Sequence, residues 1–151
     1  MLVIHENRGL NPYIEDVARR LAKAGFMALA PDGLTSVGGY PGNDADGREL
    51  QKTVDRVELM NDFFNGFEYL LNREDCTGKV GAVGFCYGGG VVSAIAVAYP
   101  ELAAGVPFYG ASVDADQVAQ IEAPLMIQMA ALDQRINAMW PEFHKALEEN
   151  D

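Results

Sequence analysis

The sequence is poor in the residues that most often carry catalysis and metal binding. Only two histidines and two cysteines occur among its 151 residues. Two cysteines are too few for a disulfide framework, so a small disulfide-stabilised scaffold is excluded. Any mechanism that needs a histidine base must use His5 or His144.

Basic residues are also scarce. The chain has 11 Lys and Arg against 22 Asp and Glu, which gives a net charge of −11. Such an acidic protein repels phosphate backbones and anionic lipids. We therefore expect neither a nucleic acid nor a membrane surface as its partner.

Long apolar segments are missing as well. The longest weakly polar stretch, residues 80–100, is interrupted by glycines in its middle, whereas a membrane-spanning helix needs about 20 predominantly apolar residues. The N-terminal residues lack the basic region and the long apolar run of a signal peptide. We expect a cytoplasmic protein.

Length and composition indicate one globular domain. Short apolar runs alternate along the chain with segments of helical periodicity, and Asn11, Pro12 and Gly25 supply the start and stop signals of the first helix. Strands that are apolar throughout and are each followed by a helix predict an α/β fold, with a doubly wound, mostly parallel sheet covered on both faces. Strands are expected at residues 2–4, 26–30, 79–85, 104–109 and 124–129, helices at 12–24, 48–73 (with a break near Asn61 or Gly66), 91–99, 114–121 and 136–149, and a loop at 35–46.

In such a sheet, function lies at the carboxyl ends of the strands. The polar or reactive residues at these ends are His5-Glu6-Asn7, Asp32, Cys86, Tyr109-Gly110 and Asp133.

The segment around Cys86 has a recognisable form. Gly84-Phe85-Cys86-Tyr87-Gly88 follows a predicted strand, precedes a predicted helix, and matches the Gly-x-Ser-x-Gly nucleophile elbow with cysteine in place of serine. The flanking glycines let strand and helix approach each other, and the helix N-terminus favours a thiolate. The same residues fit two other readings, a buried cysteine in a packing turn and a glycine-rich anion cradle. Cys76 lies in a loop without such a context.

Several segments together resemble the dienelactone hydrolase (carboxymethylenebutenolidase) family of the α/β-hydrolase superfamily. They occur in the order of that family and span nearly the whole chain. The matching segments are residues 5–9, 25–33, 78–81, 84–89, 106–110 and 124–133.

The resemblance implies a cysteine hydrolase mechanism. Cys86 corresponds to the nucleophile, and Asp133 corresponds to the triad acid that orients a histidine. The backbone N–H groups of Asn7 and Tyr87 correspond to the oxyanion hole. Asp133 taken alone also fits a turn or a helix cap.

The resemblance also implies two charged residues near the substrate. Glu6 matches the family's carboxylate beside the resting cysteine, and Arg48 matches an arginine that holds the substrate carboxylate. By residue type alone, Glu6 fits a solvated loop residue equally well, and Arg48 fits a surface residue of a helix. Tyr109 either lines the pocket or packs. No metal and no organic cofactor is implied.

The family's catalytic histidine follows one more strand beyond the helix after Asp133, and no histidine here matches it. We expect His144 to be a surface or packing residue and His5 to be structural. The chain is therefore interpreted as a single partial domain, residues 1–151, that lacks both edges of the sheet. Its five strands would have the order 2-1-3-4-5, with lower stability than a whole enzyme or with association.

The predicted function is hydrolysis of small lactones or esters through an acyl-enzyme, impaired by the absence of the histidine. The alternative is a flavodoxin-like binding module whose glycine-rich turn holds an anion.

Overall fold

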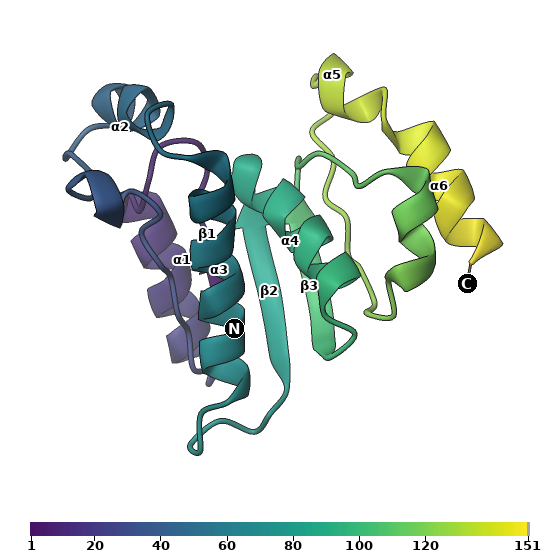
Figure 1. The fold of residues 1–151 in the computed structure, drawn as a ribbon, viewed down its shortest axis with the longest axis horizontal. Coiled ribbons are helices and arrows are strands. Elements are labelled where there is room, and N and C mark those ends of the chain that lie inside the picture. Colours follow the sequence, from purple (N-terminus) through teal and green to yellow (C-terminus); the bar gives the residue numbers. More distant parts are fainter. Residues whose placement is uncertain (151) are drawn as a thin grey trace.

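The computed structural model describes residues 1–150, and a parallel sheet forms its centre (Figure 1). Its strands are β1 (Leu2–Ile4), β2 (Val80–Phe85) and β3 (Leu102–Phe108), in the order β1-β2-β3. The other two predicted strands form only isolated parallel bridges, Leu29 with Leu2 on one side, and Leu125 with Gly105 and Gln128 with Phe108 on the other. The five segments therefore have the predicted order 2-1-3-4-5.

Helices connect these segments. The first one, α1 (Pro12–Lys23), begins and ends as predicted, since the Asn11 side chain accepts a hydrogen bond from the Ile14 N–H (3.1 Å) and Gly25 follows with a φ of 96°. The others are α2 (Asp44–Gln51), α3 (Arg56–Leu71), α4 (Tyr87–Ala98), α5 (Gln134–Asn137) and α6 (Trp140–Glu149), with 3-10 turns η1 (Thr35–Val37) and η2 (Ala115–Gln120).

The prediction of one helix over residues 48–73 was wrong. Two helices occupy the region, and they are separated where the Asp55 side chain caps α3 by accepting hydrogen bonds from two backbone amides. Neither Asn61 nor Gly66 interrupts α3. Gly66 is a packing residue, because a Cβ there would lie 3.1 Å from the side chain of Pro31. The predicted loop 35–46 likewise contains η1 and the start of α2.

The C-terminal helices also differ from the expectation. Residues 136–149 form parts of two helices, and α6 begins where Pro141 occupies one of its first two positions, which suits proline. The predicted helix 114–121 is the 3-10 turn η2.

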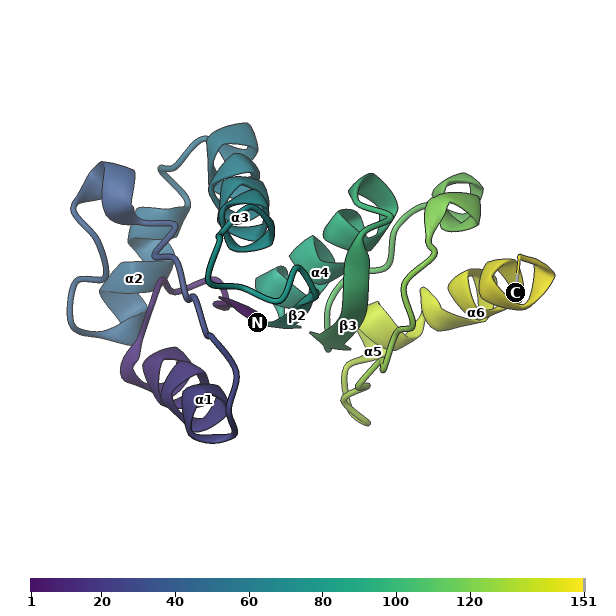
Figure 2. The same ribbon diagram turned by 90° about the horizontal axis from the view of Figure 1, so that it is seen from below.

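The sheet lies between two layers of helices. Figure 2 shows α1 on one face, and α3 with α4 on the other. All three residues of β1 are fully buried because both faces of this strand are covered, Leu2 and Ile4 packing in the α3–α4 core and Val3 on the α1 side. Among residues 1–150, no helix combines the length and apolar character that spanning a membrane requires.

Candidate active site

Cys86 lies at the carboxyl end of β2, in a strained turn that leads into α4. Its φ of 52° and ψ of −109° are unusual for a residue with a side chain. The turn is fixed to the neighbouring strand because the Cys86 N–H donates a hydrogen bond to the Phe108 carbonyl oxygen at 2.9 Å. This geometry agrees with the elbow predicted from the sequence.

The glycines of the elbow are required for close packing. A Cβ on Gly84 would overlap the Gly88 carbonyl, and a Cβ on Gly88 would overlap the carbonyl of Ile4 in β1. A Cβ on Gly89 would lie 2.6 Å from the Phe108 carbonyl oxygen. Protein backbone therefore packs directly against these three glycines, and this close approach of strand and helix is what the elbow reading requires.

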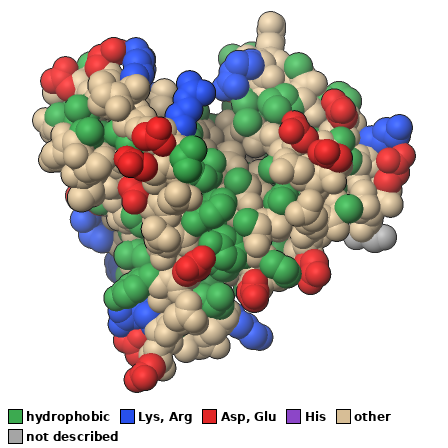
Figure 3. Space-filling view, viewed as in Figure 1, with side chains coloured by type: hydrophobic (Ala, Val, Ile, Leu, Met, Phe, Trp, Pro, Cys, Tyr) green, Lys and Arg blue, Asp and Glu red, His purple; other side chains and the backbone are tan. Residues whose placement is uncertain are grey.

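Two backbone amides accompany the thiol. Tyr87 is the first residue of α4, where an N–H has no partner within the helix, and Asn7 lies in the turn after β1. Both residues line, together with Cys86, a cavity of about 450 Å³ that is bounded by α3, α4 and α5. Figure 3 shows the molecule hollowed at the top of the view, between α3 and α5.

Glu6 is held by one neighbour on each carboxylate oxygen. The Tyr109 hydroxyl donates a hydrogen bond to Oε1 at 3.4 Å, and the Arg8 Nε lies 3.6 Å from Oε2. Tyr109 directly follows β3 with a φ of 40°, and it both packs against the core on the α1 side and lines the Cys86 cavity. Burial, followed by the charge of Glu6, raises the pKa of Tyr109 to about 12, so the phenol is a hydrogen-bond donor at neutral pH.

Arg8 is a neighbour of Glu6 that the sequence did not reveal, although neither residue is among those that line the cavity. Its Nη1 donates to Asp44 Oδ2 at 2.9 Å, across 36 residues of sequence. This hydrogen bond is the main cause that raises the pKa of Arg8, so the guanidinium is charged. The only signal in the sequence was the place of Arg8 two residues after Glu6, since nothing local indicates a partner in α2.

Asp133 lies, as predicted, between the last strand segment and α5. Its side chain caps α5 by accepting a hydrogen bond from the Ile136 N–H at 3.0 Å. Arg135 and Ile136 line the Cys86 cavity, whereas Asp133 is not among the lining residues. The structure therefore shows the capping role, and the triad role stays a prediction.

Arg48 lies in the last turn of α2 and is exposed. It is not among the residues that line the cavity. The arginine that lines the cavity is Arg135, and Arg8 lies beside Glu6.

His5 is fully buried, and both of its ring nitrogens bond to backbone groups. Its Nε2 accepts from the Gly33 N–H at 3.0 Å, and its Nδ1 lies 2.6 Å from the Glu6 carbonyl oxygen, to which it donates. Burial lowers the pKa of His5, so the ring is neutral and structural, as expected.

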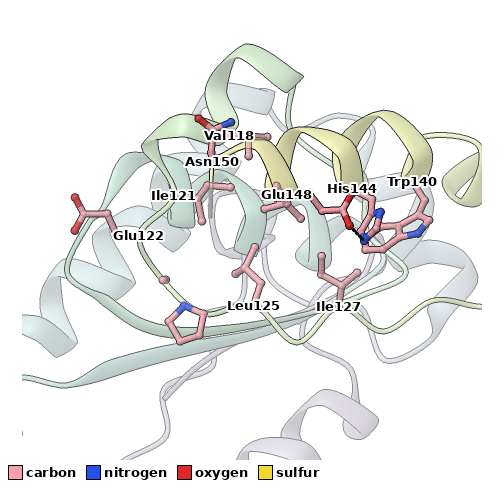
Figure 4. A pocket seen from close by; sticks show the side chains of 12 residues that line it. Val118, Ile121, Glu122, Leu125, Ile127, Trp140, His144, Glu148 and Asn150 are labelled. Carbon is pink, nitrogen blue, oxygen red and sulfur yellow. Dashed lines mark ion pairs between the residues drawn. The ribbon is translucent and has the colours of Figure 1, made fainter.

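His144 lies on α6, where its ring packs 4.9 Å from that of Trp140 and its Nε2 is 3.7 Å from Glu148. It lines a different hollow, of about 560 Å³, between α6 and the segment 121–127 (Figure 4). Neither histidine of the chain thus lines the Cys86 cavity.

The remaining cysteine, Cys76, is half-buried against the α3–α4 core, away from the sheet's carboxyl edge. Within residues 1–150, no three side chains of His, Cys, Asp or Glu gather as a set of metal ligands.

Comparison with known proteins gives a consistent result. Residues 1–151 match the model of the dienelactone hydrolase family. A protein named as hydrolase fragment YghX from Escherichia coli is 80% identical over 55 residues, which are 36% of this chain and 47% of that protein. A protein assigned as a carboxymethylenebutenolidase in Methylorubrum extorquens is 29% identical over 150 residues, covering 90% of this chain and 52% of that one.

Among solved structures, one described as a dienelactone hydrolase from Klebsiella pneumoniae superposes with a TM-score of 0.80 at 25% identity. The match covers 99% of this chain and 68% of the other. The chain spans about half the length of the curated relatives named here.

Proposed function

Because this chain belongs to the dienelactone hydrolase family, we propose that it carries the acylation half of a hydrolase that opens small esters or lactones through Cys86. The observation that carries the proposal is the placement of Cys86. Its side chain stands on a strained turn at a helix N-terminus and lines a cavity with Asn7 and Tyr87, whose amides can receive an oxyanion.

The reaction proceeds in two parts. The Cys86 thiolate attacks the carbonyl carbon, and the carbonyl oxygen becomes an oxyanion held by the two amides. Collapse of this intermediate expels the alkoxide, which takes up a proton, and leaves a thioester on Cys86. Water must then hydrolyse the thioester, a step that a histidine base normally assists.

The second part, hydrolysis of the thioester, should be slow in this chain. His5 has both ring nitrogens bonded to backbone, and His144 lines another hollow, so neither can deliver water to a thioester at Cys86. We therefore expect a single acylation followed by a stall. Asp133 as triad acid and Arg48 as a substrate ligand stay predictions.

The test is a burst experiment with 4-nitrophenyl acetate on the 151-residue chain. About one equivalent of 4-nitrophenol per chain should be released, and mass spectrometry should find one acetyl group on Cys86. The Cys86→Ala variant should give no burst, whereas the matched variant Cys76→Ala should behave as the parent, because Cys76 is half-buried against the α3–α4 core and does not line the cavity.

Two outcomes would contradict the proposal. A burst of the same size from Cys86→Ala would exclude Cys86 as the nucleophile. Rapid multiple turnover by the parent chain would contradict the expectation that thioester hydrolysis is slow without a histidine base.

A further inference from the structure

Arg8 connects the candidate active site to a helix that does not itself line the cavity. One side of its guanidinium lies beside Glu6, with Nε 3.6 Å from Oε2. The other side donates from Nη1 to Asp44 at 2.9 Å. Arg8 Nε is buried and has no hydrogen-bond partner among the described residues, so the strong contact that fixes this side chain is the one with Asp44.

Asp44 uses both carboxylate oxygens. Oδ2 accepts from Arg8, while Oδ1 accepts from the Asn11 amide (3.2 Å) and from the Tyr40 hydroxyl (3.0 Å). The hydrogen bond from Arg8 is the main cause that holds the pKa of Asp44 below its ordinary value, so the carboxylate is charged. As the first residue of α2, it also lies where the helix dipole favours a negative charge.

The backbone of α2 packs on the same loop. A Cβ on Gly47 would overlap the Arg8 carbonyl oxygen, so the helix is in direct contact with the backbone of Arg8. β1 ends at Ile4, so Glu6 and Asn7 follow the last residue of the strand, and the side chains that hold their loop include His5, which donates to the Glu6 carbonyl oxygen, and Arg8. The contact with α2 is both a steric and an ionic one.

We propose that Asp44 is a positioning residue for acylation: it holds Arg8, and through Arg8 it sets the position of Glu6 and Asn7 beside Cys86. This inference rests on the proposed function of Cys86. The competing reading is an ordinary surface ion pair. Arg8 and Asp44 are 33% and 42% exposed, and pairs as exposed as these often contribute little.

The experiment compares two variants of the same turn. Asp44→Asn removes the charge that binds Arg8. Asp46→Asn removes a charge from the first turn of α2 in the same way, but the Asp46 side chain bonds only to Asn43. Both variants lose a carboxylate from the first turn of α2, so the difference between them reports on the partners of Asp44, which are Arg8, Asn11 and Tyr40.

The readout is the pre-steady-state release of 4-nitrophenol over a range of ester concentrations, with thermal unfolding measured in parallel. Asp44→Asn should lower the maximal acylation rate constant about tenfold or more, because a misplacement of about 1 Å is enough for such a loss. The concentration for half-saturation should hardly change, since no binding contact is removed. Asp46→Asn should acylate as the parent chain does.

A double variant shows whether Asp44 acts through Arg8. If it does, Arg8→Gln combined with Asp44→Asn should be no slower than Arg8→Gln alone. If Asp44→Asn fails to fold, Arg8→Gln tests the same ion pair, because it removes the other partner. Equal acylation by Asp44→Asn and Asp46→Asn, or independent effects in the double variant, would overturn the inference while leaving Cys86 as the nucleophile. A burst that survives Cys86→Ala would instead overturn the proposed function.

Discussion

The contact between Gly88 and β1 allows a prediction with a defined magnitude. In the variant Gly88→Ala, the added Cβ would overlap the Ile4 carbonyl and lie 2.6 Å from the His5 carbonyl oxygen, whereas real Cβ atoms essentially never approach within 3.0 Å. All of these neighbours are backbone atoms, so no side chain can rotate out of the way. Either β1 or α4 has to move.

The free energy follows from two opposing effects. Forcing a methyl group into a packed interior costs about 1–3 kcal/mol or more. Replacing glycine by alanine in a helix gains at most about 1 kcal/mol. Because the added methyl group overlaps backbone carbonyl groups, which cannot rotate away, we expect Gly88→Ala to lower the free energy of unfolding by about 2 kcal/mol.

Gly90→Ala is the matched control. It lies in the same first turns of α4, but the nearest atoms to its Cβ would be 3.6 Å away, an ordinary contact distance. This variant should be as stable as the parent or more stable by up to about 1 kcal/mol. Urea unfolding followed by circular dichroism measures both, and equal stabilities for the two variants would refute the steric argument.

Two further predictions concern buried polar groups. Burial lowers the pKa of His5, so the unfolded chain binds a proton at a pH where the folded chain does not. The free energy of unfolding should therefore fall as the pH drops below about 6.5. Urea titrations at a series of pH values measure this dependence, and the same dependence in His5→Asn would show that it does not come from His5. The Tyr87 hydroxyl is buried without a hydrogen-bond partner among residues 1–150. Tyr87→Phe should therefore raise the free energy of unfolding by about 1 kcal/mol. A decrease in the same titration would show that the hydroxyl makes a hydrogen bond in the folded protein.

Some of this structure could be predicted because its causes are local. The elbow is recognisable from five residues because Gly84 packs directly on the Gly88 carbonyl, and α1 is recognisable from its Asn11 cap and a glycine stop. The division of residues 44–71 into two helices could also have been found, since Asp55 is a good cap, but apolar residues continue at helical spacing across the break and concealed it.

The environment of the thiol could not be predicted in the same way. The Arg8–Asp44 pair joins residues that are 36 positions apart, and it depends on how α2 packs against the loop after β1. The spacing of Arg48 could not show which side of α2 it occupies, and in the structure it is exposed. Asp133 illustrates a different limit, because the same residue type at a helix start serves as a cap and as a triad acid.

The way in which the elbow is built also bears on how such proteins diversify. The turn is held by glycine contacts and by the Cys86 backbone N–H, and the sulfur takes no part in any of these interactions. Evolution can therefore change the attacking atom without altering the scaffold that presents it. Conversely, the glycines are constrained even in descendants that have lost catalysis, because they hold β1, β2 and α4 together.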